Sequence, residues 1–178
     1  MHHRRHSLRR PGELHLSEEG RELARRLRTE VGPYDLVVTS SAVRAVETAQ
    51  ALADPPAATL DELREMPEEV ARAIATVKVA DFATLLDLVR THPVVAHYAA
   101  RQAELWRGLG RRVPDGGRVL IVSHGGIIEV GACGALGSAV ETWGGPLAPL
   151  EGVALTMDAD SWTGGSVLRL RPEPTGTR

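Results

Sequence analysis

The stretch Val119-Leu120-Ile121-Val122-Ser123-His124-Gly125-Gly126-Ile127-Ile128 decides the fold prediction for this chain. Four apolar residues, most of them β-branched, end abruptly at Ser-His-Gly-Gly, and a second apolar pattern follows. This order predicts a buried strand, a tight glycine turn and then a helix. Because ligands bind at the carboxyl ends of strands in open α/β sheets, we expect His124 at the edge of a ligand crevice.

The rest of the chain alternates short apolar segments with helical patterns. Further strands are predicted over 35–40, 57–60, 152–157 and 166–170. Helices are predicted from the N-cap Ser17 to Gly32 and from Ala42 to Pro55, and 160–165 is predicted as a hairpin-like loop. This alternation predicts a three-layer α/β/α sandwich, whose mostly parallel sheet is mixed because its last two strands run antiparallel.

The domain organisation follows from length and composition. A chain of 178 residues favours one domain. We place this domain at residues 1–172 and expect a flexible tail at 173–178, which is rich in Pro, Gly and Thr. Residues 68–112 carry amphipathic helical patterns and no convincing strand, so we expect a helical, cap-like region there.

Composition excludes several classes of protein. The net charge of −2 gives no general attraction to nucleic acid, and 3% aromatic residues offer few stacking platforms for bases. Cys133 is the single cysteine, which excludes an internal disulfide. No apolar run reaches membrane-spanning length, and no signal core follows the basic N-terminus. We therefore expect a cytoplasmic protein without nucleic-acid or membrane partners, and the oligomeric state stays open.

Polar residues with a common chemistry occur at three places, two of them directly after apolar segments. They are Arg5-His6-Ser7, Ser40-Ser41 with Arg44 one helical turn later, and Ser123-His124-Gly125. Guanidinium groups bind phosphoryl oxygens in a bidentate manner. One imidazole can attack phosphorus, and a second can stabilise charge on the transferring group. Brought together at one sheet edge, these residues predict a phosphoryl-transfer site.

These segments resemble the successive signatures of a known family. Together with Leu16-Ser17-Glu18-Glu19-Gly20 and the Ser-Ser-x-x-Arg-Ala-x-x-Thr-Ala run at 40–49, they are similar to the histidine phosphatase superfamily, also called the phosphoglycerate mutase-like family. The resemblance implies a phosphoglycerate mutase-like fold. It also implies an enzyme that hydrolyses a phosphate monoester, or a phosphoprotein, through a phosphohistidine intermediate and needs no cofactor.

The resemblance also implies a role for each matching residue. His6 would be the nucleophile, Arg5 and Arg44 would hold the phosphoryl oxygens, and His124 would stabilise the transition state. Glu65, in Leu63-Arg64-Glu65-Met66, would protonate the leaving oxygen. Glu62 is the alternative acid.

The binding residues and the metal question complete the predicted site. Ser7, Arg9 and Gly125 are candidate substrate-binding residues, and Arg10 and His15 are further candidates in the same loop. His2, His3, His6 and His124 could be mistaken for a metal site. Arginines among them disfavour a cation, so no metal is expected.

Two other functions stay open at this point. A mutase would return the phosphate to an isomer of the substrate, but this chain is short for the insertions that such members carry. A binding module would keep the phosphate pocket without the chemistry. The candidate substrates are a small sugar or metabolite phosphate, a phosphohistidine protein and a phosphorylated Ser or Thr peptide.

Overall fold

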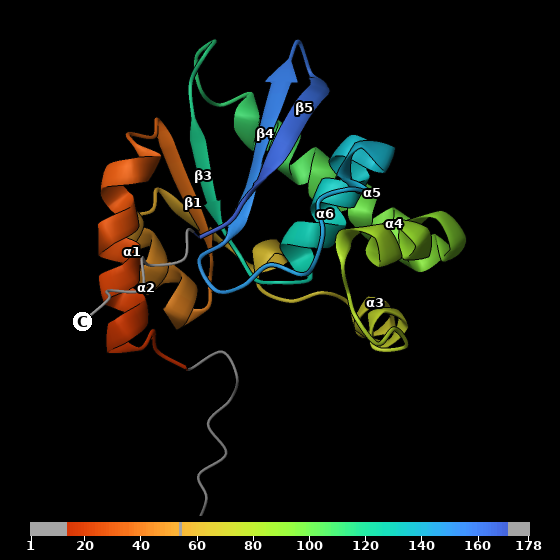
Figure 1. The fold of residues 1–178 in the computed structure, drawn as a ribbon. Coiled ribbons are helices and arrows are strands. Elements are labelled where there is room, and N and C mark those ends of the chain that lie inside the picture. The colour runs from red at the N-terminus through yellow and green to blue at the C-terminus, as the bar shows by residue number, and fades with distance from the viewer. Residues whose placement is uncertain (1–13, 54, 171–178) are drawn as a thin grey trace, which may run out of the picture.

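A three-stranded parallel sheet forms the centre of the protein. The computed structural model describes residues 14–53 and 55–170, which Figure 1 draws in colour. The sheet consists of β1 (Leu36–Ser40), β2 (Ala58–Leu60) and β3 (Val119–Val122), in the order β2-β1-β3. Val38 pairs with Ala58 on one side and with Ile121 on the other, and both pairings are parallel. The predicted α/β fold class is confirmed.

Some helices cover the two faces of this sheet, and others pack beyond it. In chain order they are α1 (Glu18–Val31), α2 (Val43–Leu52), the 3-10 turn η2 (Asp61–Leu63), α3 (Glu68–Ile74), α4 (Phe82–Thr91), α5 (Pro93–Gly110), α6 (Ile127–Leu136) and the 3-10 turn η3 (Gly137–Val140). In Figure 1, α1 and α2 lie on one side of the sheet and α5 and α6 on the other.

The alternation of side chains in β1 explains the two helical layers. Successive strand residues point to opposite faces, so Val37 packs in a cluster with Ala45 and Ala49 of α2. Val38 instead packs with Trp106 and other residues of α5. Every residue of β1 is buried, as expected for a central strand with both faces covered.

The first helix begins where the sequence predicts. Ser17 caps α1 by accepting a hydrogen bond of 3.1 Å from the backbone N–H of Gly20. The acidic residues Glu18 and Glu19 occupy the first turn, where the positive end of the helix dipole favours them. The helix ends at Gly32, whose φ of 73° is the left-handed conformation that glycine adopts at little cost.

The C-terminal strands differ from the prediction in two ways. β4 (Gly152–Asp158) and β5 (Ser161–Leu168) pair antiparallel and form a sheet of their own within the described residues. β5 also begins at Ser161, so most of the predicted loop 160–165 belongs to the strand. Glycine is needed at 165 because a Cβ there would lie 2.6 Å from the carbonyl oxygen of Ala154.

The helical region between β2 and β3 divides into two parts. α4 and α5 pack on α6 around a buried cluster that includes Phe82, Leu85, Val95 and Val130. α5 also covers the sheet, whereas α3 lies farther out (Figure 1). Across residues 14–53 and 55–170, no helix has both the length and the apolar character needed to cross a membrane.

Candidate active site

The carboxyl ends of the three parallel strands bring the predicted site residues to one edge. β1 ends at Ser40, β2 is followed by η2, and β3 is followed by His124. Since β1 is the central strand, the segment after it can touch the segments after both neighbours. The structure shows a contact in each direction: Ser40 with His124, after β3, and Ser41 with Asp61, after β2.

His124 is the centre of this edge. Its Nε2 lies 2.7 Å from the Ser40 hydroxyl oxygen, and its Nδ1 lies 3.1 Å from Nη2 of Arg44. A guanidinium can only donate hydrogen bonds, so Nδ1 must be the accepting nitrogen. The neutral ring therefore carries its hydrogen on Nε2, which donates to the Ser40 hydroxyl oxygen.

The surroundings of His124 keep its ring neutral. Burial, the positive charge of Arg44 and the positive charge of Arg64 lower its pKa from 6.5 to about 4. At neutral pH the ring is thus an uncharged donor, held between a hydroxyl group and a cation. Such a group can hydrogen-bond to an anion without carrying a charge of its own.

Ser40 links this histidine to the start of α2. The Ser40 hydroxyl oxygen also accepts a hydrogen bond of 3.1 Å from the backbone N–H of Ala42. Arg44 then lies in the first turn of the helix, which brings its side chain back over the strand end. The sequence pattern of small polar residues followed by an arginine therefore has a structural reason.

The turn after His124 is held by a carboxylate that the sequence analysis did not single out. Glu129 is 2% exposed and accepts hydrogen bonds from the backbone N–H groups of Gly126, at 2.6 Å, and Leu147, at 3.0 Å. Gly126 has a φ of 82°, which favours glycine. Gly125, predicted to bind substrate, is exposed beside it. Glu129 thus fixes the shape of the turn.

The predicted acid segment follows β2 at the same edge. Leu63 is fully buried, and its carbonyl oxygen accepts a hydrogen bond of 2.7 Å from the Ser123 hydroxyl. The Glu65 side chain is 77% exposed and forms an ion pair with Arg64. Glu62 is also exposed, and its backbone carbonyl accepts a hydrogen bond from Gln102. Their proton-donor roles stay predictions.

A third carboxylate joins this edge. Asp61 accepts a hydrogen bond from the hydroxyl of Ser41. Ser41 directly follows Ser40, the residue that contacts His124. The sequence contains a signal for Asp61, because it directly follows the predicted strand 57–60, just as Ser41 directly follows the predicted strand 35–40. The other predicted residues, Arg5, His6, Ser7 and Arg9, lie outside the described part of the chain.

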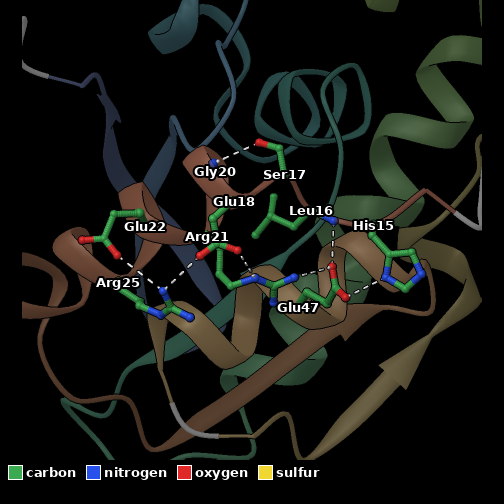
Figure 2. Close-up of polar contacts among 9 residues, drawn as sticks. All are labelled: His15, Leu16, Ser17, Glu18, Gly20, Arg21, Glu22, Arg25 and Glu47. Atoms are coloured by element: carbon green, nitrogen blue, oxygen red, sulfur yellow. Dashed lines mark hydrogen bonds and ion pairs between the residues drawn. The ribbon is translucent and has the colours of Figure 1, made fainter.

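A polar cluster joins the predicted substrate loop to α2. Figure 2 shows Glu47 between His15, whose Nδ1 lies 2.8 Å away, and the backbone N–H of Leu16, which donates at 2.7 Å. Arg21 adds an ion pair at 3.5 Å. The His15 hydrogen bond, followed by that from Leu16, lowers the pKa of Glu47. Since Glu47 is three residues after Arg44, one helix contacts both the loop and His124.

The fold and this edge together define a class of protein. A parallel sheet with helices on both faces and an arginine–histidine pair at its carboxyl edge is suited to binding anions. Residues 2–166 match the family model of the histidine phosphatase superfamily (branch 1). The chain belongs to this superfamily, and this membership supports phosphatase or phosphoryl-transfer activity.

A solved structure has a similar fold. It is a phosphoserine phosphatase from Entamoeba histolytica in complex with 3-phosphoglyceric acid, 20% identical in sequence. The match covers 70% of this chain and 68% of that chain, with a TM-score of 0.51. No curated protein sequence matches the chain.

Proposed function

We propose that the protein is a phosphatase that hydrolyses a phosphate monoester through a phosphohistidine intermediate on His6. One observation carries the proposal: Arg44 and a neutral His124 meet at the carboxyl edge of the sheet of a histidine phosphatase superfamily member. Arg44 can donate hydrogen bonds to phosphoryl oxygens, and His124 can do so when its Nε2–H turns from the Ser40 hydroxyl to the ligand. Such donors are usually the largest contribution that a site of this kind makes to catalysis.

The proposed reaction has two steps. His6 attacks phosphorus, and the bond to the leaving oxygen breaks while Glu65 or Glu62 supplies the proton. Water then attacks the phosphohistidine, which releases inorganic phosphate and restores His6. Arg5 and Arg44 hold the phosphoryl oxygens in both steps, and the His124 ring donates to the same group as negative charge develops.

The proposed substrate is a small phosphorylated metabolite, with a phosphoprotein as the alternative. The similar phosphoserine phosphatase was solved with 3-phosphoglyceric acid, which is a small phosphorylated acid. We also propose that Met66 and α3 border the site. The methyl group of Met66 lies 3.0 Å from the position of a Cβ on Gly126, so the segment that leads into α3 begins beside the His124 turn.

The test combines turnover with trapping of the intermediate. Wild-type protein should release inorganic phosphate from an aryl phosphate. The phosphohistidine intermediate should be trapped without acid, because phosphohistidine is acid-labile. The His6→Ala variant should lose both turnover and the trapped phosphoryl group. His97→Ala is the matched control, since His97 is exposed on α5, and it should retain activity. Turnover that persists in His6→Ala would refute this mechanism. Isomerised ester without released phosphate would indicate a mutase.

A further inference from the structure

Arg64 is a cation at the site edge to which the proposed reaction assigns no role. It follows η2, and its backbone N–H donates a hydrogen bond of 2.9 Å to the carbonyl oxygen of Asp61. The residues on either side of Arg64 contact the turn that carries His124. The Leu63 carbonyl holds the Ser123 hydroxyl, and Met66 packs against Gly126. Arg64 is therefore fixed beside the turn by residues on either side of it.

The electrostatics agree with this position. The positive charge of Arg64 contributes to the lowered pKa of His124, so its field reaches the imidazole ring. The Arg64 side chain is 35% exposed, and its buried Nε makes an ion pair with Glu65 but no hydrogen bond. Arg64 can therefore face a ligand that binds at His124.

The present partner of Arg64 is weakly held. Glu65 Oε1 lies 3.3 Å from Nε, in an ion pair whose acidic side chain is mostly exposed. Exposed ion pairs of this kind contribute little because solvent screens them and both side chains lose conformational freedom. An anionic group of a ligand can therefore replace Glu65 at the guanidinium at little cost.

We propose that Arg64 binds a carboxylate of the substrate, next to the phosphate, so that the preferred substrates are phosphorylated carboxylic acids. A guanidinium binds a carboxylate with two parallel hydrogen bonds. A second phosphate fits less well, because Asp61, Glu62 and Glu65 lie within three residues of Arg64 in the chain and would repel a dianion more strongly than a monoanion. This proposal rests on the proposed function, since it requires the phosphate to lie at Arg44 and His124.

The experiment measures binding of ligands that cannot be hydrolysed. We would compare 3-phosphonopropionate and 4-phosphonobutanoate, which carry a carboxylate, with butylphosphonate, which does not, by titration calorimetry at neutral pH. Wild-type protein should bind at least one carboxylate-bearing ligand about 10–100-fold more tightly than butylphosphonate. Arg64→Met should abolish this preference and leave the Kd of butylphosphonate within about twofold.

Arg72→Met is the matched control, because it removes one positive charge from exposed α3 and should keep the preference. Circular dichroism should show that both variants are folded. Equal binding of all three ligands by wild-type protein would overturn the proposal. An equal loss of affinity for all three ligands in Arg64→Met would also overturn it, since Arg64 would then bind the phosphonate group itself. Hydrolysis of an aryl phosphate is measured separately, so a failure here leaves the proposed phosphatase activity standing.

Discussion

Nη2 of Arg44 donates a hydrogen bond of 3.1 Å to Nδ1 of His124, so the helix after β1 determines the tautomer of the histidine after β3. The two side chains come from different strand ends, 80 residues apart in sequence. Each restricts the other: the guanidinium is held in place by the ring, and the ring is kept neutral in part by the guanidinium. We therefore expect Arg44 and His124 to act as a unit in the proposed reaction.

A double-mutant cycle tests this coupling. Arg44→Met and His124→Gln should each lower kcat on an aryl phosphate by about 100–1000-fold, the usual cost of removing one transition-state donor. The double variant should lose little more than the worse single variant, because the residues that act as a unit are not additive. Arg72→Met and His97→Gln make the same chemical changes at exposed positions and should change kcat less than about twofold. Losses that multiply in the double variant would show independent roles.

The lowered pKa of His124 also makes stability depend on pH. The ring takes up its proton near pH 6.5 in the unfolded chain but only near pH 4 in the folded protein. Between these values the unfolded state binds more protons, so this contribution to stability is full above pH 6.5 and is lost as the pH falls toward 4. Urea unfolding at pH 7.5 and 5.0 measures the effect. His124→Gln should lose less stability than wild-type protein over this range, and an equal loss in both proteins would contradict the shift.

Binding of an anion should raise the pKa of His124. Vanadate or phosphate at Arg44 would offset the positive charge that lowers this pKa and would itself favour the protonated ring. An NMR titration of the His124 ring should therefore show a midpoint shifted toward neutral pH when the ligand is present. A His124 midpoint that does not move with saturating ligand would mean that the anion binds elsewhere.

The meeting of Arg44 and His124 could be predicted from sequence, whereas the elements that support it could not. Apolar runs located β1 and β3, and parallel strands end at one edge, so the polar residues after them had to meet. Propensity could not show that Ser40 would bond to His124, because that contact depends on the register between the strands. The position of Arg64 beside the His124 turn depends in the same way on tertiary contacts of its neighbour Leu63, whose carbonyl oxygen accepts a hydrogen bond from Ser123.

Glu129 and the start of β5 show two different limits of the sequence analysis. Glu129 did leave a signal, because it is the one charged residue in the apolar helix α6 and stands three residues after the turn glycine. A carboxylate in the first turn of a helix is common at exposed positions too, so this signal alone does not indicate a buried acceptor. In β5, Gly164 and Gly165 indicated a loop. Both lie within the strand, and at Gly165 the carbonyl oxygen of Ala154 and the side chain of Leu136 leave no room for a Cβ, a tertiary constraint that no local sequence pattern reports.

Glu129 should control both stability and activity. Glu129→Gln replaces one accepting oxygen with an amino group, which would face a backbone N–H of Gly126 or Leu147. A buried donor without an acceptor costs about 1–3 kcal/mol, so urea unfolding should show a loss of this size. Because the same turn carries His124, kcat should fall while the KM changes less. Glu141→Gln is the control, since Glu141 is half-exposed and only 3.8 Å from Arg90. Unchanged stability and kcat in Glu129→Gln would show that the turn does not depend on this carboxylate.

The contact between α5 and α6 offers a test of the packing behind the site. A Cβ on Gly134 of α6 would collide with the backbone carbonyl of Ala99 in α5, which cannot move without shifting the helix. We expect Gly134→Ala to lower the free energy of unfolding by about 1–3 kcal/mol, the usual cost of overpacking. Gly108→Ala, in α5, adds the same methyl group where no atom lies within 4 Å. It should stabilise the protein by about 0.5–1 kcal/mol, since alanine favours the helix more than glycine does. Urea unfolding of both variants measures this contrast, and two changes of the same sign would mean that helix propensity, rather than the close approach of α5 and α6, determines the effect at Gly134.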